Sequence, residues 1–132
     1  MKKTISKNKV LIIDDEIEFA ETCAECLALR DFEVMAFGDA NEAMNFIRSD
    51  WKPDVVLLDL KMPEIDGLEV LDMIKNYDPR IEVILITAHG STEHGISGMQ
   101  RGLFDFLMKP VELDELVEKI HQAINLRLSV QD

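Results

Sequence analysis

Short, mostly apolar runs that alternate with helix-like segments are the feature that most limits what this chain can fold into. Four such runs cover residues 10–13, 55–58, 83–86 and 104–108, and a further strand-like segment covers residues 33–37. Runs of this kind are typical of strands buried on both faces of a sheet. Because strands and helices alternate, the connections should be right-handed β-α-β crossovers. The sequence therefore predicts an α/β fold with a five-stranded parallel sheet, doubly wound, with helices on both faces.

Helices are expected between and after these strands, where apolar residues recur at helical spacing. Asp39, with a carboxylate three residues later, has the pattern of an N-cap. The fourth helical segment contains Gly95 and Gly98, and an interior glycine costs up to ~1 kcal/mol. That segment is either a poor helix or a helix kept marginal so that it can shift. The expected helices span about residues 17–30, 40–48, 67–76, 91–102 and 113–128.

Polar residues follow four of the apolar runs directly. They are Asp14 and Asp15, Asp59, Thr87 and Lys109. Because functional groups gather at the carboxyl ends of parallel strands, these side chains should converge on one edge of the sheet. Taken singly, each acid has an ordinary explanation as a surface acid at a turn, an N-cap or a loop cap. Together they predict a site that holds a divalent cation and receives a phosphoryl group, since oxygen ligands suit Mg²⁺ and phosphoryl transfer needs positioning and charge compensation.

The net charge of −12 over 132 residues limits the classes of partner. Such a field repels nucleic acid phosphates and anionic lipid, so we expect neither direct nucleic acid binding nor membrane association. The sequence has no apolar stretch of the ~20 residues that a membrane span needs, and its start lacks the apolar core of a signal peptide. A cytoplasmic location with reduced cysteine thiols is expected.

One domain is expected, over residues 9–128. Residues 1–8 form a basic leader that we expect to be flexible, and residues 129–132 are a C-terminal tail or the start of a linker. Cys23 and Cys26 are spaced as C-x-x-C, but they lie within the apolar stripe of the first expected helix. Core thiols are therefore favoured over a redox pair or a zinc site.

Four stretches give the chain a specific family resemblance: VLIIDDE, VVLLDLKMPEIDGLEVL, VILITAHGS and LFDFLMKPVELDEL. Over residues 9–128 it resembles a receiver domain of bacterial two-component response regulators. The resemblance implies the flavodoxin-like receiver fold. It also implies a signalling switch, with no catalysis beyond phosphoryl transfer to, and hydrolysis from, its own phosphoacceptor. The donor would be a histidine kinase or a histidine phosphotransfer protein. Phosphorylation would reshape the surface of the fourth helix, fifth strand and fifth helix, which would then engage an effector or a second copy of the chain.

The resemblance also assigns roles to single residues. Asp59 would be the phosphoacceptor, with Thr87 and Lys109 contacting the phosphoryl group. Phe106 would be the switch aromatic, at a position where tyrosine is frequent. The Mg²⁺ ligands would be Asp14, Asp15, Asp59 and the backbone carbonyl of Lys61.

Some positions bear on how such a switch behaves. Lys61 and His89 lie two residues after the phosphoacceptor and after the switch threonine, where the family tunes phosphate lifetime. Lys61 offers only hydrogen-bond donors and should not orient an attacking water, whereas a neutral His89 could orient one. A phosphoryl group that outlasts that of fast-cycling chemotaxis-type receivers is favoured. Asp31 stands where a glycine often ends the first helix, so a strained or different cap is expected. The resemblance also raises the expectation of a cis peptide at Lys109–Pro110, which would aim Lys109 into the site.

Two alternatives belong to other classes. A phosphohydrolase of the haloacid-dehalogenase type would have a second aspartate where this chain has Lys61, and it would have a substrate cap. A flavodoxin-like cofactor binder needs a loop of small and hydroxyl residues after the first strand, where this chain has Asp-Asp-Glu.

Overall fold

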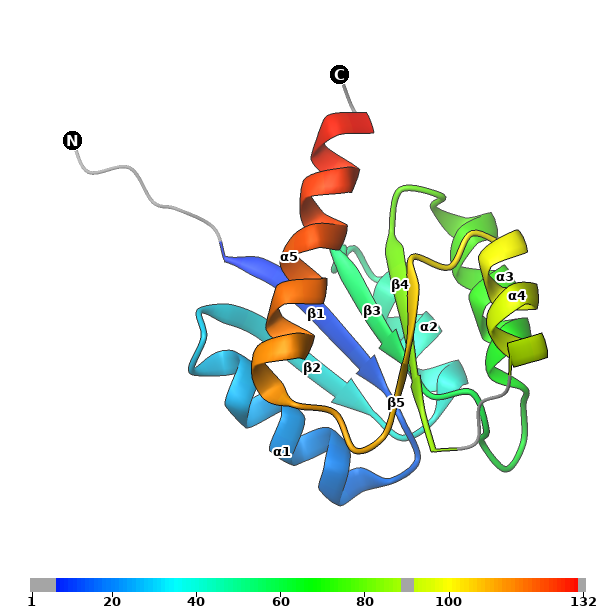
Figure 1. The fold of residues 1–132 in the computed structure, drawn as a ribbon, viewed down its shortest axis with the longest axis horizontal. Coiled ribbons are helices and arrows are strands. Elements are labelled where there is room, and N and C mark those ends of the chain that lie inside the picture. Colours follow the sequence, from blue (N-terminus) through cyan, green and yellow to red (C-terminus); the bar gives the residue numbers. More distant parts are fainter. Residues whose placement is uncertain (1–6, 89–91, 131–132) are drawn as a thin grey trace.

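Five parallel strands form one sheet in the order β2-β1-β3-β4-β5 (Figure 1). The computed structural model describes residues 7–88 and 92–130, and every statement below concerns those residues. The strands are β1 (Asn8–Ile13), β2 (Phe32–Phe37), β3 (Val55–Leu58), β4 (Glu82–Thr87) and β5 (Asp105–Met108). The helices are α1 (Ile17–Ala28), α2 (Ala40–Arg48), α3 (Gly67–Tyr77), α4 (Thr92–Gln100) and α5 (Leu113–Val130). The doubly wound parallel sheet predicted from the sequence is confirmed.

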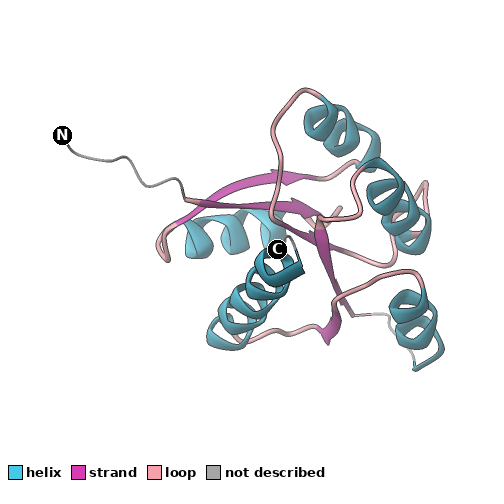
Figure 2. Cartoon of the chain, turned by 90° about the horizontal axis from the view of Figure 1, so that it is seen from above, coloured by secondary structure: helices cyan, strands magenta, loops and turns pink. Residues whose placement is uncertain are grey.

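Helices cover both faces of the sheet, as Figure 2 shows from above. Successive side chains of a strand point to opposite faces, so the strands supply two separate cores. Val10 and Ile12 of β1 pack in one core with residues of α1 and α5. Leu11 and Ile13 pack in the other with residues of α2 and α3. Burial on both faces explains why the strand sequences are continuously apolar rather than alternating.

The ends of the elements lie close to where the sequence placed them. Asp39 caps α2 as expected, because its side chain accepts hydrogen bonds from the backbone N–H groups of Asn41 and Glu42. The glycine-containing segment does form a helix, α4. α1 ends at Ala28, two residues early, and Asp31 after it has φ = 69°. Asp31 thus takes the left-handed conformation usually left to glycine, which aspartate tolerates better than most residues. α5 runs two residues further than expected, to Val130.

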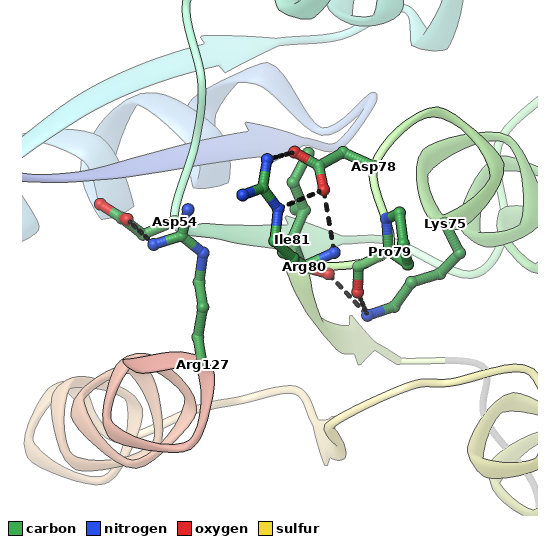
Figure 3. A network of polar contacts seen from close by, with 7 residues as sticks. All are labelled: Asp54, Lys75, Asp78, Pro79, Arg80, Ile81 and Arg127. Carbon is green, nitrogen blue, oxygen red and sulfur yellow. Dashed lines mark hydrogen bonds and ion pairs between the residues drawn. The ribbon is translucent and has the colours of Figure 1, made fainter. Parts of the chain in front are cut away.

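Asp54, the residue before β3, connects several elements at the end of the sheet where the parallel strands begin. This end is called the amino edge below, and the opposite end, where the strands finish, is called the carboxyl edge. Its Oδ1 accepts a hydrogen bond from Arg127 Nη1 of α5 at 2.8 Å, and its Oδ2 accepts one from the Lys9 backbone N–H at 2.8 Å. Its own backbone N–H and carbonyl bond to the backbones of Lys9 and Glu82. Figure 3 shows how the Arg127 side chain extends from α5 to this aspartate. The last turns of α5 are thereby fixed to the starts of β1, β3 and β4.

A second group of contacts closes the turn between α3 and β4 at the same edge (Figure 3). Lys75 Nζ donates to the carbonyls of Pro79 and Ile81, at 3.2 and 2.6 Å. Asp78 accepts hydrogen bonds from the backbone and the guanidinium of Arg80. Most polar groups at the amino edge therefore satisfy one another, although the buried Nε of Arg127 has no hydrogen-bond partner among the described residues.

Cys23 and Cys26 are both free thiols, Cys23 buried and Cys26 half-buried. Burial raises the pKa of the Cys23 thiol to about 11, so it stays protonated and apolar in character. Among the described helices, none has the length and apolar composition required to span a membrane. Of the proposed leader, residues 1–6 lie outside the described part of the chain.

Candidate phosphoryl-transfer site

The ladder of the sheet extends one residue past β1 and β3, and this places two aspartates side by side. Ile13 and Leu58 are partners in the parallel pairing of the two strands. One residue on, the Asp14 N–H donates to the Phe37 carbonyl at 2.9 Å, and the Asp59 N–H donates to the Ile13 carbonyl at 2.9 Å. The backbones of both aspartates are therefore held by the sheet itself, which makes their side chains rigidly placed.

Three carboxylates meet at this edge. Asp14, Asp15 and Asp59 each offer an oxygen, and these oxygens lie within 4.8 Å of one another. Asp14 and Asp59 are buried, with 2% and 4% of their surface exposed, while Asp15 is exposed. Asp59 Oδ1 is buried and has no hydrogen-bond partner among the described residues. Crowded carboxylates with an unsatisfied buried oxygen fit a hard divalent cation, because such a cation supplies the missing positive charge.

Burial raises the pKa of Asp14 above its ordinary value, and the charge of Asp59 acts in the same direction. Hydrogen bonds from Lys109 and from the Glu16 N–H oppose this effect without cancelling it. Folding therefore disfavours the ionised form of Asp14. The geometry places two acids together although their mutual repulsion opposes folding, which is typical of a site arranged for a ligand.

Lys109 brings a positive charge to the same edge from the residue after β5. Its backbone N–H donates to the Thr87 carbonyl at 2.9 Å, and the Lys109–Pro110 peptide is cis, as expected. Its Nζ donates to Asp14 Oδ2 at 2.8 Å and to Glu16 Oε1, and it lies 4.2 Å from the centre of the Phe19 ring. Burial disfavours the charged form of Lys109, but the hydrogen bonds to the two carboxylates outweigh burial and raise its pKa. Lys109 is thus a firmly protonated cation.

The remaining predicted residues lie around this centre. Thr87 is fully buried at the end of β4. Phe106 of β5 is half-buried against the core under α2 and α3, and Gly95 of α4 faces its ring, since a Cβ at Gly95 would lie 3.8 Å from Phe106 Cδ2. Lys61 is exposed in the loop after β3. His89 lies outside the described residues.

Three features of the site escaped the sequence analysis. Glu16 and Phe19 contact the Lys109 ammonium, and neither is among the residues that the sequence predicts for the site. Gly67 lies against the backbone after β3: a Cβ there would be 2.5 Å from the Asp59 carbonyl oxygen and 2.7 Å from Leu60 Cα. Its N–H donates to the Leu60 carbonyl at 2.7 Å. A glycine directly at the start of a helix, eight residues after the aspartate, is the signal that could have indicated this close approach.

Comparison with known proteins agrees with this geometry. Residues 10–121 match the family described as the response regulator receiver domain. The chain belongs to this family. Receiver domains are in general phosphorylated and bind Mg²⁺ at acidic residues. The family match leaves the phosphohydrolase and cofactor-binding alternatives without support.

Individual proteins and solved structures show which receiver domains this chain is similar to. It is 35% identical over 120 residues to the regulatory protein AtoC of Escherichia coli (strain K12), a match covering 91% of this chain and 26% of AtoC. Its fold matches a response regulator receiver domain protein from Clostridium thermocellum with a TM-score of 0.88 and 32% identity, covering 93% of this chain and 98% of that one. It also matches the beryllofluoride-activated NtrC4 receiver domain dimer, with a TM-score of 0.85, 29% identity and coverage of 90% and 98%. The chain spans about a quarter of the length of AtoC.

Proposed function

We propose that this receiver domain is a phosphorylation-dependent switch that accepts a phosphoryl group on Asp59. The observation that carries the proposal is the buried, unpartnered Oδ1 of Asp59, which lies beside two further carboxylates and near one protonated lysine. An oxygen in this position is ready to act as a nucleophile once the surrounding negative charge is compensated. Catalysis would be limited to phosphoryl transfer to, and hydrolysis from, the protein's own Asp59.

The donor is a phosphohistidine on a histidine kinase or a histidine phosphotransfer protein. An Asp59 carboxylate oxygen forms a bond to phosphorus as the P–N bond of the phosphohistidine breaks, and the histidine nitrogen leaves with the electron pair. The Asp14, Asp15 and Asp59 carboxylates and the Lys61 backbone carbonyl would hold Mg²⁺, which when bound neutralises charge on the phosphoryl oxygens. Lys109 supplies a second positive charge, and the Thr87 hydroxyl donates a hydrogen bond to a phosphoryl oxygen.

Phosphorylation adds about −1.5 to −2 charges, by analogy with other phosphorylated residues. Thr87 and Lys109 are drawn to that charge, and Phe106 moves inward behind Thr87. The surface formed by α4, β5 and α5 then changes shape. Exposed apolar side chains on this surface support its use in binding: Ile96, Met99 and Met108.

The changed surface engages an effector or a second copy of this chain, and the likeness to the NtrC4 receiver dimer supports the second copy. The net charge of −12 supports a role without direct nucleic acid or membrane binding. A cytoplasmic location is part of the proposal, since its donors and effectors would be met there. Lys61 and His89 are proposed to tune the lifetime of the phosphoryl group, with Lys61 hindering rather than orienting an attacking water.

A direct experiment tests the phosphoacceptor. Purified protein is incubated with acetyl phosphate and Mg²⁺, and intact-mass spectrometry should show the gain of one phosphoryl group. Asp59→Asn keeps the size and shape of the side chain but removes the nucleophile, so it should abolish the gain. Titration with Mg²⁺ should show saturable binding that both Asp15→Asn and Asp59→Asn weaken strongly.

Two results would overturn the proposal. One is a label that mass spectrometry places on Asp14 or on a histidine. The other is a parent protein that binds no Mg²⁺ and gains no phosphoryl group.

A further inference from the structure

Glu16 is a second carboxylate on the ammonium of Lys109. It follows Asp15 directly, and its backbone N–H donates to Asp14 Oδ1 at 2.9 Å, which fixes the residue at the start of α1. Its Oε1 accepts a hydrogen bond from Lys109 Nζ, whose other carboxylate partner is Asp14. The Glu16 side chain is 63% exposed, whereas that of Lys109 is 10% exposed. The pair therefore lies at the mouth of the site, with the lysine pointing inward and the glutamate open to solvent.

The two carboxylates hold Lys109 on the Asp14 side of the site. A lysine ammonium has three N–H donors, and two of them go to Asp14 and Glu16. Asp59 Oδ1 receives none of them. A phosphoryl group on Asp59 would bring oxygens that need a cation, and Lys109 is the lysine placed to meet them. Its third N–H can turn to them, and releasing one of the present partners would free a second N–H and let the ammonium move toward these oxygens.

Glu16 is the partner more easily given up. Asp14 is buried and belongs to the set of carboxylates that fits a metal, and both facts fix the position of its side chain. Glu16 is solvent-exposed, and an ion pair that water can reach is weaker than a buried one. The exchange from Glu16 to the phosphoryl oxygens is thus the step that lets Lys109 read the modification.

We propose that Glu16 is a positioning residue that holds Lys109 in the unphosphorylated protein and sets how readily the lysine turns to the phosphoryl group. The proposal rests on the function proposed above, in which Asp59 is the phosphoacceptor. Its consequence is that removing the Glu16 charge favours the phosphorylated state.

The test measures binding of beryllofluoride, a mimic of the phosphoryl group, to the full chain at saturating Mg²⁺. Three proteins are compared by NMR titration: the parent, Glu16→Gln and Glu18→Gln. Glu18 is an exposed acid in the first turn of α1 with no hydrogen bond or ion pair found among the described residues, so its variant controls for the loss of one negative charge. Glu16→Gln should bind beryllofluoride about two- to fivefold more tightly than Glu18→Gln, the range expected for an exposed ion pair.

A second measurement separates positioning from a merely structural effect. The ε-methylene NMR signals of Lys109, assigned by their loss in Lys109→Arg, are recorded without Mg²⁺ or beryllofluoride. They should shift in Glu16→Gln and stay in place in Glu18→Gln, because Glu16 contacts the ammonium and Glu18 does not.

The outcomes are distinct. If the parent binds no beryllofluoride, the proposed phosphoacceptor itself is wrong. If the parent binds it and Glu16→Gln binds no more tightly than Glu18→Gln, Glu16 does not hold Lys109 and the inference fails alone. Unmoved Lys109 signals in Glu16→Gln would overturn the inference in the same way.

Discussion

Two aspartates flank the same four-residue strand, β3, and their carboxylates are satisfied in opposite ways. Asp54, before the strand, accepts hydrogen bonds on both oxygens, one from Arg127 and one from the Lys9 backbone. Asp59, after the strand, has a buried Oδ1 with no partner in the described part of the chain. Both side chains lie largely out of solvent, so burial does not distinguish them. What differs is whether the fold provides the partner or leaves its place open.

The contrast separates structure from function at the two edges of one sheet. At the amino edge, opposite charges neutralise each other and tie α5 to the strands. At the carboxyl edge, the carboxylates of Asp14, Asp15 and Asp59 lie together beside the ammonium of Lys109. The pKa of Asp14 is raised by burial and by the charge of Asp59. The buried Nε of Arg127 also lacks a partner, but the charge of Arg127 is paired with Asp54. The unpartnered Asp59 oxygen lies instead beside two like charges, which lowers stability and fits a site that a ligand completes. Carboxylates thus stabilise the fold at one edge, and at the other edge they form a site that a ligand would complete.

The largest expected effect on stability comes from replacing a glycine at the carboxyl edge, compared with a glycine at the amino edge. In Gly67→Ala, the new Cβ would lie 2.5 Å from the Asp59 carbonyl oxygen and 2.7 Å from Leu60 Cα. Backbone atoms must move to relieve this contact, so we expect a loss of about 3 kcal/mol in the free energy of unfolding. Urea denaturation measures that loss, and Mg²⁺ titration should show weakened binding because the backbone at Asp59 shifts.

Gly102, before β5 at the amino edge, is the matched control for Gly67. It has φ = 97°, and a Cβ there would lie 3.3 Å from Lys75 Cε, a side-chain atom rather than backbone. Gly102→Ala should therefore cost about 1–2 kcal/mol from backbone strain, with Mg²⁺ binding unchanged. Equal losses in both variants with unchanged Mg²⁺ binding would show that Gly67 does not set the backbone of the site.

The next largest effect on stability is expected when the aspartate on either side of β3 is replaced by asparagine. Asp54→Asn removes the charge that Arg127 pairs with, and we expect a loss of about 2 kcal/mol, since a hydrogen bond between charged groups is worth about 1.5–3 kcal/mol. The pair is 17% and 19% exposed, so screening by water is limited. Asp59→Asn in Mg²⁺-free buffer should leave stability unchanged or raise it, because it removes repulsion with Asp14.

Both variants are compared by thermal and urea unfolding at neutral pH. A loss for Asp59→Asn as large as that for Asp54→Asn would mean that the Asp59 carboxylate is a structural acceptor. The comparison between the two edges would then break down.

The sequence predicted the fold well because its signals are local. The four residues of β3 are apolar throughout and are bounded by aspartates, so the strand was placed without error. The alternation of strands and helices then fixed the parallel sheet through the handedness of the crossovers. The helix ends were less certain: Asp31 was suspected as an unusual cap, but Asp50, which also has positive φ, gave no comparable signal.

The site was predicted as a set of residues rather than as a set of contacts. Asp14, Asp59, Thr87 and Lys109 were expected together because parallel strands end at one edge, and the structure brings them there. The Lys109 contact with Glu16 joins positions 93 residues apart, and side-chain direction at that range cannot be inferred from spacing. The pairing of Arg127 with Asp54, 73 residues apart, was missed for the same reason.

The smallest expected effect concerns the pH dependence of an acid at each edge. The pKa of Asp14 in the folded protein is raised by burial and by Asp59, so its ionised form opposes folding. The stability linked to this group is present below the unfolded pKa and is lost as the pH rises through the folded pKa. Asp14→Asn does not titrate, so in Mg²⁺-free buffer it should be slightly more stable than the parent at pH 7. The gain should vanish as the pH falls toward 4.

Asp78 at the amino edge should behave with the opposite sign. Burial acts to raise its pKa, but the hydrogen bonds from Arg80 outweigh burial and lower it. Its contribution to stability is present above the unfolded pKa and is lost as the pH falls through the folded pKa. Asp78→Asn should therefore be less stable than the parent at pH 7, with a difference that also shrinks in acid. Unfolding curves of both variants from pH 7 to well below pH 4 check the pair, because the folded pKa of Asp78 lies below its unfolded value. A loss of stability for both variants at pH 7 would mean that the carboxyl edge, like the amino edge, already supplies the partner its acid needs.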